Sequence, residues 1–236
     1  MKRLICCLDG TWNNDKGDAP LTNVAKLHRN ILPIGADGIQ QVSHYITGIA
    51  SAEGTRAQFL QGAVGFEVDD RIKEGYAKLA ADYEPDDELY LFGFSRGAFE
   101  ARSLAGFITL FGLAKNGSDF STDEAWSLYT KHPDWSDPQT MQRLHAAAHQ
   151  SVKIKCVGVW DTVGNLGNPL TSKGFIGKHF DFHDTALHPS IEVGLHALSI
   201  DEKRGPFSPS LWTMPSGTEL PENQTCSTCW FSGSRT

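Results

Sequence analysis

The chain has 236 residues, of which 40% are hydrophobic and 21% charged, a composition that is ordinary for a globular protein and too apolar for a disordered one. Its net charge is −7, from 21 basic and 28 acidic side chains, and it contains no block of lysine and arginine. Surfaces that follow a nucleic-acid backbone carry such basic blocks, so we expect no nucleic-acid partner.

The first ten residues, MKRLICCLDG, contain a short apolar run. Asp9 interrupts this run far short of the apolar region and cleavage site of a signal peptide. No other apolar run approaches the roughly 20 residues that cross a bilayer. The five cysteines are odd in number and unevenly spaced, which disfavours a disulfide framework. We therefore expect a cytoplasmic protein in a reducing compartment, with membrane contact that is at most peripheral.

Three short apolar runs, each bounded by polar or turn residues, predict buried parallel strands. They are RLICCLDG at 3–10, ELYLFGFS at 88–95 and VKIKCVGVWDT at 152–162. Between the first two runs, Ile72, Tyr76 and Leu79 recur at helical spacing, which predicts a helix over 69–83. Parallel strands joined by crossover helices predict an α/β fold, in which helices cover both faces of a mainly parallel sheet.

Helices are predicted for the segment after the second strand. Residues 96–114 are rich in Ala, Leu and Phe without proline, which predicts a buried helix ending near Gly112. Ser121 and Glu124 have the spacing of a capping box at the start of another helix, and residues 137–151 predict a third. Beyond these the pattern weakens, and we expect a helix within SIEVGLHALSIDEKR and a strand at TCWFSG.

The pentapeptide GFSRG at 93–97 fits the pattern G-x-S-x-G. A predicted strand precedes it and a predicted helix follows, which is the context of a nucleophile elbow, where a serine occupies a sharp turn. Such a turn leaves no room for side chains beside it, so Gly93 and Gly97 fit these positions. A bare pentapeptide also occurs by chance in loops, but the context favours Ser95 as a catalytic nucleophile.

An oxyanion hole is predicted beside this serine. The backbone N–H of Arg96 begins the helix, where the dipole favours negative charge, so it would supply half of the hole. The other half commonly comes from a glycine-containing loop after another central strand. The loop CLDGTWNN is the candidate, with Asp9 and Gly10, because glycine allows close backbone approach.

A serine hydroxyl needs a base, generally a histidine that a carboxylate orients, and in nucleophile-elbow enzymes the chain order is serine, acid, histidine. Asp161 ends a predicted strand and is the candidate acid, with a helix cap or Asx turn as the structural alternative. The later histidines are His179, His183, His188 and His196. His196 has apolar neighbours that would fix its ring, although a core histidine bonded to a carbonyl explains the same pattern equally well.

Three groupings of histidine or cysteine residues are weaker candidates for a functional site than the serine turn. His179 and His183 flank Phe-Asp-Phe without a third ligand at a recognised spacing. His145 and His149 are four apart on a predicted helix but lack the glutamate of a zinc protease. The stretch CSTC is a lone C-x-x-C. We expect no metal and no cofactor.

Four ordered stretches resemble the type VI secretion phospholipase-effector-like α/β hydrolase domain, a family first described as a domain of unknown function. They are CLDGTWNN, YLFGFSRGAFEARSLAGF, VWDTVGNLG and HALSIDEKRGPFSPSLW. The resemblance implies a single α/β-hydrolase domain over residues 1–236, built as a three-layer sandwich. It also implies a Ser-Asp-His triad that hydrolyses a small-molecule or lipid ester, including the acyl esters of phospholipids. Ser95 then carries over as the nucleophile and Asp161 as the acid.

The chain departs from this family at its C-terminal end. In the family pattern a histidine and a run of glycines follow a strand resembling WFSG, whereas here only Ser234, Arg235 and Thr236 follow. Two interpretations stay open. Either His196 is the base of a complete hydrolase, or the chain is truncated before its base and is a non-catalytic, hydrolase-like module. Effector members of the family are delivered by secretion machinery without a signal peptide. Two locations therefore stay open for this chain: the cytoplasm, or delivery by such machinery.

Overall fold

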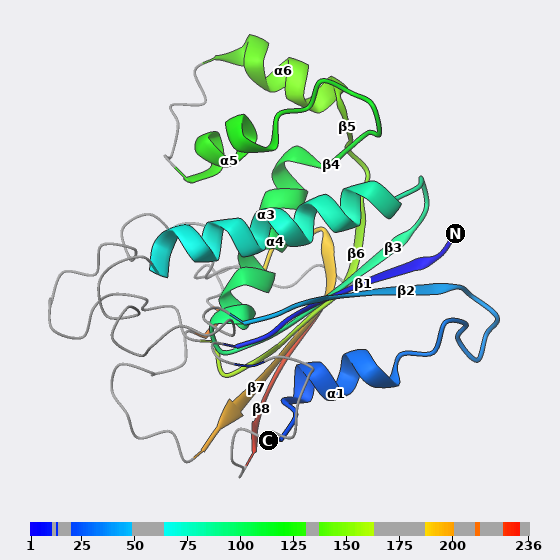
Figure 1. Ribbon diagram of the computed structural model, residues 1–236, viewed down its shortest axis with the longest axis vertical. Coiled ribbons are helices and arrows are strands. Elements are labelled where there is room, and N and C mark those ends of the chain that lie inside the picture. Colours follow the sequence, from blue (N-terminus) through cyan, green and yellow to red (C-terminus); the bar gives the residue numbers. More distant parts are fainter. Residues whose placement is uncertain are drawn as a thin grey trace, which may run out of the picture.

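A computed structural model describes residues 1–10, 13, 20–48, 64–130, 137–162, 187–200, 211–212 and 224–231 (Figure 1). Within these residues, six strands form one sheet in the order β2-β1-β3-β6-β7-β8, and all neighbours are parallel. The strands are β1 (Arg3–Leu8), β2 (Gln41–Ile46), β3 (Glu88–Phe94), β6 (Lys153–Trp160), β7 (Ile191–Ser199) and β8 (Thr225–Phe231). The predicted parallel α/β sheet is confirmed.

Helices cover both faces of the sheet, which gives the fold three layers (Figure 1). α3 (Val64–Asp82) and α4 (Arg96–Phe111) pack on one face, and α1 (Asn23–Asn30) packs on the other. This arrangement is that of an α/β-hydrolase-like fold, as expected from the sequence.

The sequence of β1 lacks polar–apolar alternation because both of its faces are buried. Leu4, Cys6 and Leu8 belong to the core under α3 and α4, whereas Ile5 and Cys7 belong to the smaller core under α1. A parallel strand covered on both sides is expected to show such a continuous apolar run.

α4 is the central helix of the structure. Most of its 16 residues are buried, and it packs against β1, β3 and β6 as well as α3. It ends before Gly112, whose φ of 76° favours glycine, so the predicted end is confirmed. The turn that precedes α4 therefore lies at the middle of the sheet, between the helix layer and the strand ends.

A helical excursion with two short helices follows the C-terminal end of α4 (Figure 1). Ser95 precedes the other end of this helix. β4 (Leu113–Ala114) and β5 (Ala148–His149) form an antiparallel pair, and between them lie α5 (Thr122–Thr130) and α6 (Pro138–Ala146). Ser121 Oγ accepts the N–H of Glu124 at 3.2 Å, so this half of the predicted capping box is confirmed. At 1.5 Å per residue, about 24 Å of α4 separates the excursion from the serine.

The predicted helix within 190–204 is wrong, because Ile191–Ser199 forms β7 and pairs with β6 on one side and β8 on the other. Its glutamate, leucine and alanine residues favour a helix locally, but two parallel neighbours satisfy its backbone and override that preference. No clear sequence signal predicts α1 and β2. They intervene between β1 and α3, so the helix before β3 follows β2 rather than β1.

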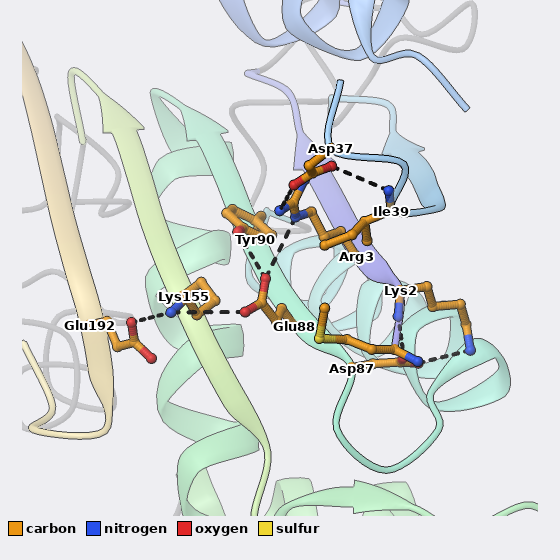
Figure 2. Close-up of polar contacts among 10 residues, drawn as sticks. Lys2, Arg3, Asp37, Ile39, Asp87, Glu88, Tyr90, Lys155 and Glu192 are labelled. Atoms are coloured by element: carbon orange, nitrogen blue, oxygen red, sulfur yellow. Dashed lines mark hydrogen bonds and ion pairs between the residues drawn. The ribbon is translucent and has the colours of Figure 1, made fainter. Parts of the chain in front are cut away.

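Charged side chains join neighbouring strands near their N-terminal ends. Arg3 pairs with Asp37 and Glu88, and Lys155 pairs with Glu88 and Glu192 (Figure 2). These ion pairs link β1, β3, β6 and β7 at the edge of the sheet opposite Ser95. Their place in the fold indicates a structural role.

Candidate active site

Ser95 lies where the chain turns from β3 directly into α4. Its backbone has φ 56° and ψ −117°, and such a positive φ at a non-glycine residue is strained, at a cost of about 1–3 kcal/mol. Ser95 occupies the N-cap position of α4, yet among the described residues its hydroxyl makes no capping hydrogen bond, and the residue is partly exposed. A nucleophile elbow requires a strained turn that holds an accessible, uncapped serine in this way.

Two glycines make this tight turn possible. A Cβ atom at Gly93 would lie 2.2 Å from the carbonyl oxygen of Gly97, and a Cβ atom at Gly97 would lie 2.2 Å from the carbonyl oxygen of Leu8. Any side chain at either position would collide with backbone. Glycine at these two positions therefore allows the ends of β1 and β3 to pack directly against the start of α4, as the G-x-S-x-G pattern predicts.

Arg96 is the first residue of α4, so no carbonyl within the helix is available to its N–H group. The positive end of the helix dipole also lies at this turn. An oxyanion that forms on a carbonyl attached to Ser95 would be stabilised by both. The oxyanion role of Arg96 is compatible with this geometry and stays a prediction.

Asp161 lies beside Ser95 at the C-terminal edge of the sheet. Phe94 and Trp160 are paired in register, and the N–H of Ser95 donates to the carbonyl of Trp160 at 2.8 Å. Asp161 has a positive φ of 46°, and its Oδ1 accepts the N–H of Ser199 at 2.6 Å, which joins the ends of β6 and β7. A carboxylate accepts more than one donor, so this contact is compatible with orienting a histidine.

His196 is buried in the middle of β7 rather than at the edge of the sheet. It pairs with Val159 and is 1% exposed. Its Nε2 is hydrogen-bonded to Thr162 Oγ1 at 3.2 Å, and the ring of Trp212 packs against it with 5.5 Å between centroids. Among the described residues its Nδ1 has no hydrogen-bond partner, so the structure joins His196 to neither Ser95 nor Asp161.

Burial lowers the pKa of His196 to about 4, and the nearby Arg102 guanidinium adds to this shift. The imidazole is therefore neutral at pH 7 and able to accept a proton. General bases work best with a pKa near the operating pH, and this pKa lies well below it. The ring thus has the environment of a packed core histidine, which is the structural alternative to the base.

His188 lies at the opposite edge of the sheet from Ser95. It precedes β7, and its Nδ1 accepts the N–H of Ser190 at 3.1 Å. Because all strands run parallel, the start of β7 and the end of β3 are at opposite edges, so His188 does not reach the serine. His179 and His183 lie outside the described residues.

Asp9 and Gly10 follow β1 beside the serine turn. A Cβ atom at Gly10 would lie 2.8 Å from the ring of Phe94, so glycine lets this loop approach the residue before Ser95. The N–H of Gly10 donates to Asp9 Oδ1 at 2.7 Å. To complete an oxyanion hole, this N–H would have to change its partner, and the oxyanion role of Asp9 and Gly10 stays a prediction.

Glu100 is a buried carboxyl near the turn that the sequence pattern does not single out. It lies in the second turn of α4, is 1% exposed, and in the described part of the chain its Oε2 has no hydrogen-bond partner. Burial raises the pKa of Glu100 well above its usual value, and the guanidiniums of Arg71 and Arg96 only partly oppose this. The sequence signal for such a buried carboxyl group is a glutamate within a helix that is predicted to be buried.

The segments expected to line a substrate pocket fall largely outside the described residues. In parallel α/β sheets they follow the C-terminal ends of the strands, and here they include 14–19, 49–63, 163–186 and 201–210. Within the ranges that are described, no three His, Cys, Asp or Glu side chains gather closely enough to hold a metal ion. In the same ranges, no helix has both the length and the apolar character needed to cross a membrane.

One of the comparisons with known proteins identifies a family. The family model described as "T6SS, Phospholipase effector Tle1-like, catalytic domain" matches residues 2–236. The uncharacterized protein YEL023C of Saccharomyces cerevisiae is 32% identical over 234 residues, which cover 90% of this chain and 33% of that protein, so the chain spans about a third of that relative. A crystal structure of an uncharacterized protein from Pseudomonas aeruginosa matches 97% of this chain and 40% of its own, with a TM-score of 0.47 and 16% identity. The chain therefore belongs to the Tle1-like catalytic domain family of type VI secretion phospholipase effectors.

Proposed function

We propose that the chain is a serine hydrolase that cleaves carboxylic esters, with the acyl esters of phospholipids as its substrate class. The observation that carries this proposal is the strained turn at Ser95, with φ 56° at the start of a buried helix. The family, described as a phospholipase effector catalytic domain, supports a lipid substrate. Such esters lie near a bilayer surface, so membrane contact would be peripheral.

In the proposed mechanism, Ser95 Oγ attacks the carbonyl carbon of the ester while a base accepts its proton. The carbonyl oxygen becomes an oxyanion, which the N–H of Arg96 stabilises; one such donor is worth about 100- to 1000-fold in rate. The base then returns the proton to the leaving alcohol, and water releases the acyl group from Ser95 by the same steps. Asp161 orients the base and stabilises its charged form.

His196 is the proposed base among the described residues, because it follows Asp161 in the chain and is neutral at pH 7. To act as the base, the His196 ring would have to break its hydrogen bond with Thr162 and reach Ser95 Oγ. The burial of the same ring against Thr162 and Trp212 favours a second candidate function, a non-catalytic, hydrolase-like module. The two functions predict different effects of substitutions at Ser95 and His196.

Hydrolysis of a short-chain p-nitrophenyl ester by the wild type, Ser95→Ala and His196→Gln separates these functions. Ser190→Ala is the matched control, since Ser190 is exposed at the opposite edge of the sheet and should behave as wild type. If both Ser95→Ala and His196→Gln lose about 10³-fold or more, the chain is a hydrolase that uses His196. If only Ser95→Ala loses activity, the base is another residue. If the wild type does not exceed Ser95→Ala, the chain is the non-catalytic module.

A further inference from the structure

We propose that Asp9 is a positioning residue for the Ser95 site: its buried carboxylate holds the loop after β1 against the serine turn and does not itself contact the substrate. This inference rests on the proposed function and assigns Asp9 a role within it. It differs from the prediction that Asp9 belongs to the oxyanion hole.

The carboxylate of Asp9 accepts hydrogen bonds from three elements around the turn. Oδ1 accepts the N–H of Gly10 at 2.7 Å, and Oδ2 accepts the hydroxyl of Thr22 at 2.7 Å and that of Tyr45 on β2. Thr22 Oγ1 in turn accepts the N–H of Ala25 at 3.0 Å and caps α1. Asp9 is 1% exposed, so protein donors replace water around its charge. The carboxylate thereby ties the end of β1 to the start of α1 and to β2.

The backbone of the same segment touches the serine turn. The carbonyl oxygen of Asp9 would lie 2.6 Å from a Cβ atom at Gly97, and Gly10 packs against the ring of Phe94. The carbonyl of Gly10 accepts the N–H of Asn13 at 3.0 Å, which anchors the loop further along. With no space between these groups, a shift at Asp9 or Gly10 displaces Phe94 and the start of α4. A displacement of about 1 Å near reacting atoms costs on the order of 100-fold in rate.

Charge and position predict opposite effects for a substitution at Asp9. A carboxylate near the turn raises the energy of a nearby oxyanion, so removing its charge alone would speed the reaction. Asp9→Asn keeps the size of the side chain but replaces one acceptor oxygen by an NH₂ group, which cannot accept the hydroxyls of Thr22 and Tyr45. Loss of positioning therefore slows the reaction, and the sign of the change identifies the role.

Asp87 provides a matched control at the far edge of the sheet (Figure 2). It is 0% exposed and accepts the backbone N–H groups of Lys2 at 2.7 Å and Glu84 at 2.9 Å. Its Oδ2 also pairs with Lys2 Nζ at 2.8 Å. Asp87→Asn thus removes a buried charge that precedes β3 without touching the serine turn. Tyr45→Phe is a milder second variant, because it deletes one donor to Asp9 from a partly exposed side chain.

The test measures the rate at which a fluorophosphonate labels Ser95, together with kcat and KM for a p-nitrophenyl ester. Each variant is assayed at a temperature where circular dichroism shows it fully folded. Asp9→Asn should lower the labelling rate and kcat by about 10- to 100-fold, with little change in KM. Tyr45→Phe should also lower the labelling rate and kcat, by a smaller factor. Asp87→Asn should keep its kcat although its Tm falls.

An Asp9→Asn variant that reacts as fast as the wild type, or faster, overturns the inference, and so does an equal loss of kcat in Asp87→Asn. If Asp9→Asn does not fold, Tyr45→Phe decides, and wild-type rates in that variant overturn the inference. A wild type that is not labelled at Ser95 overturns the proposed function and this inference with it. A labelled wild type with an equally reactive Asp9→Asn overturns the inference alone.

Discussion

Gly97→Ala tests whether the backbone contacts of the serine turn determine activity. The new Cβ atom would lie 2.2 Å from the carbonyl oxygen of Leu8 and 2.6 Å from that of Asp9, whereas real Cβ contacts stay above 3.0 Å. Both obstacles are backbone atoms, so no rotamer change relieves them. The start of α4 and the end of β1 must therefore separate by about 1 Å.

This separation sets the size of the expected effects. Overpacking costs about 1–3 kcal/mol of unfolding free energy, and about 2–4 °C of Tm accompany each kcal/mol in a chain of this length. A shift of about 1 Å at the nucleophile costs on the order of 100-fold in kcat. We expect Gly97→Ala to fold with a lower Tm and to lose most of its ester hydrolysis at temperatures where it is still folded.

Gly106→Ala makes the same substitution in the same helix. Its Cβ atom would meet the hydroxyl of Tyr129 at 2.5 Å, which is the tip of a buried side chain rather than backbone beside the serine turn. We expect this control to keep its kcat, measured by p-nitrophenyl ester hydrolysis beside a thermal melt of each variant. A Gly97→Ala variant with the kcat and Tm of the wild type would show that these contacts do not determine activity, as would an equal loss of kcat in both variants.

Three ionisable side chains give further predictions. Below its usual pKa of 6.5, His196 takes up a proton in the unfolded chain but not in the folded one until about pH 4. The unfolding free energy should therefore fall over that window by on the order of 3 kcal/mol, and urea titrations of His196→Gln should lack this fall; the same fall in the variant would contradict the assignment. Burial raises the pKa of Glu100, so the wild type should lose stability as pH rises above about 4.3. Glu100→Gln should then gain stability over the wild type between pH 5 and 8, and equal urea midpoints throughout would count against a buried proton. Asp161→Asn keeps an oxygen for the N–H of Ser199 and should lower kcat by about 10⁴ with its fold intact; an unchanged kcat would remove Asp161 from the site.

Strands β1, β3 and β6 could be predicted, because each contains a short apolar run bounded by polar or turn residues. β7 could not, since its helix-favouring residues form a strand only when β6 and β8 flank it. β2 is an edge strand in which only Ile46 is buried, so it lacks the apolar run that predicts β1, β3 and β6.

The serine turn could be predicted because its constraints are local: a strand, two glycines and a helix follow one another in the chain. The bonds of Asp9 to Thr22 and Tyr45 could not, because they join residues 13 and 36 positions apart that only the folded sheet brings together. For His196, the apolar neighbours in the sequence correctly indicated burial. They carried no information on its contact with Thr162, and its role as base stays a prediction.

The proposed function depends above all on Ser95 being the nucleophile, and mapping the site of a fluorophosphonate adduct tests this role without relying on any particular ester. The wild type and Ser95→Ala are treated in parallel, digested, and mapped by mass spectrometry, with heat-denatured wild type as the control for non-specific labelling. We expect one adduct, on the peptide that contains Ser95, in folded wild type alone. No adduct in the folded wild type, or the same labelling in Ser95→Ala, would contradict the role of Ser95 as nucleophile.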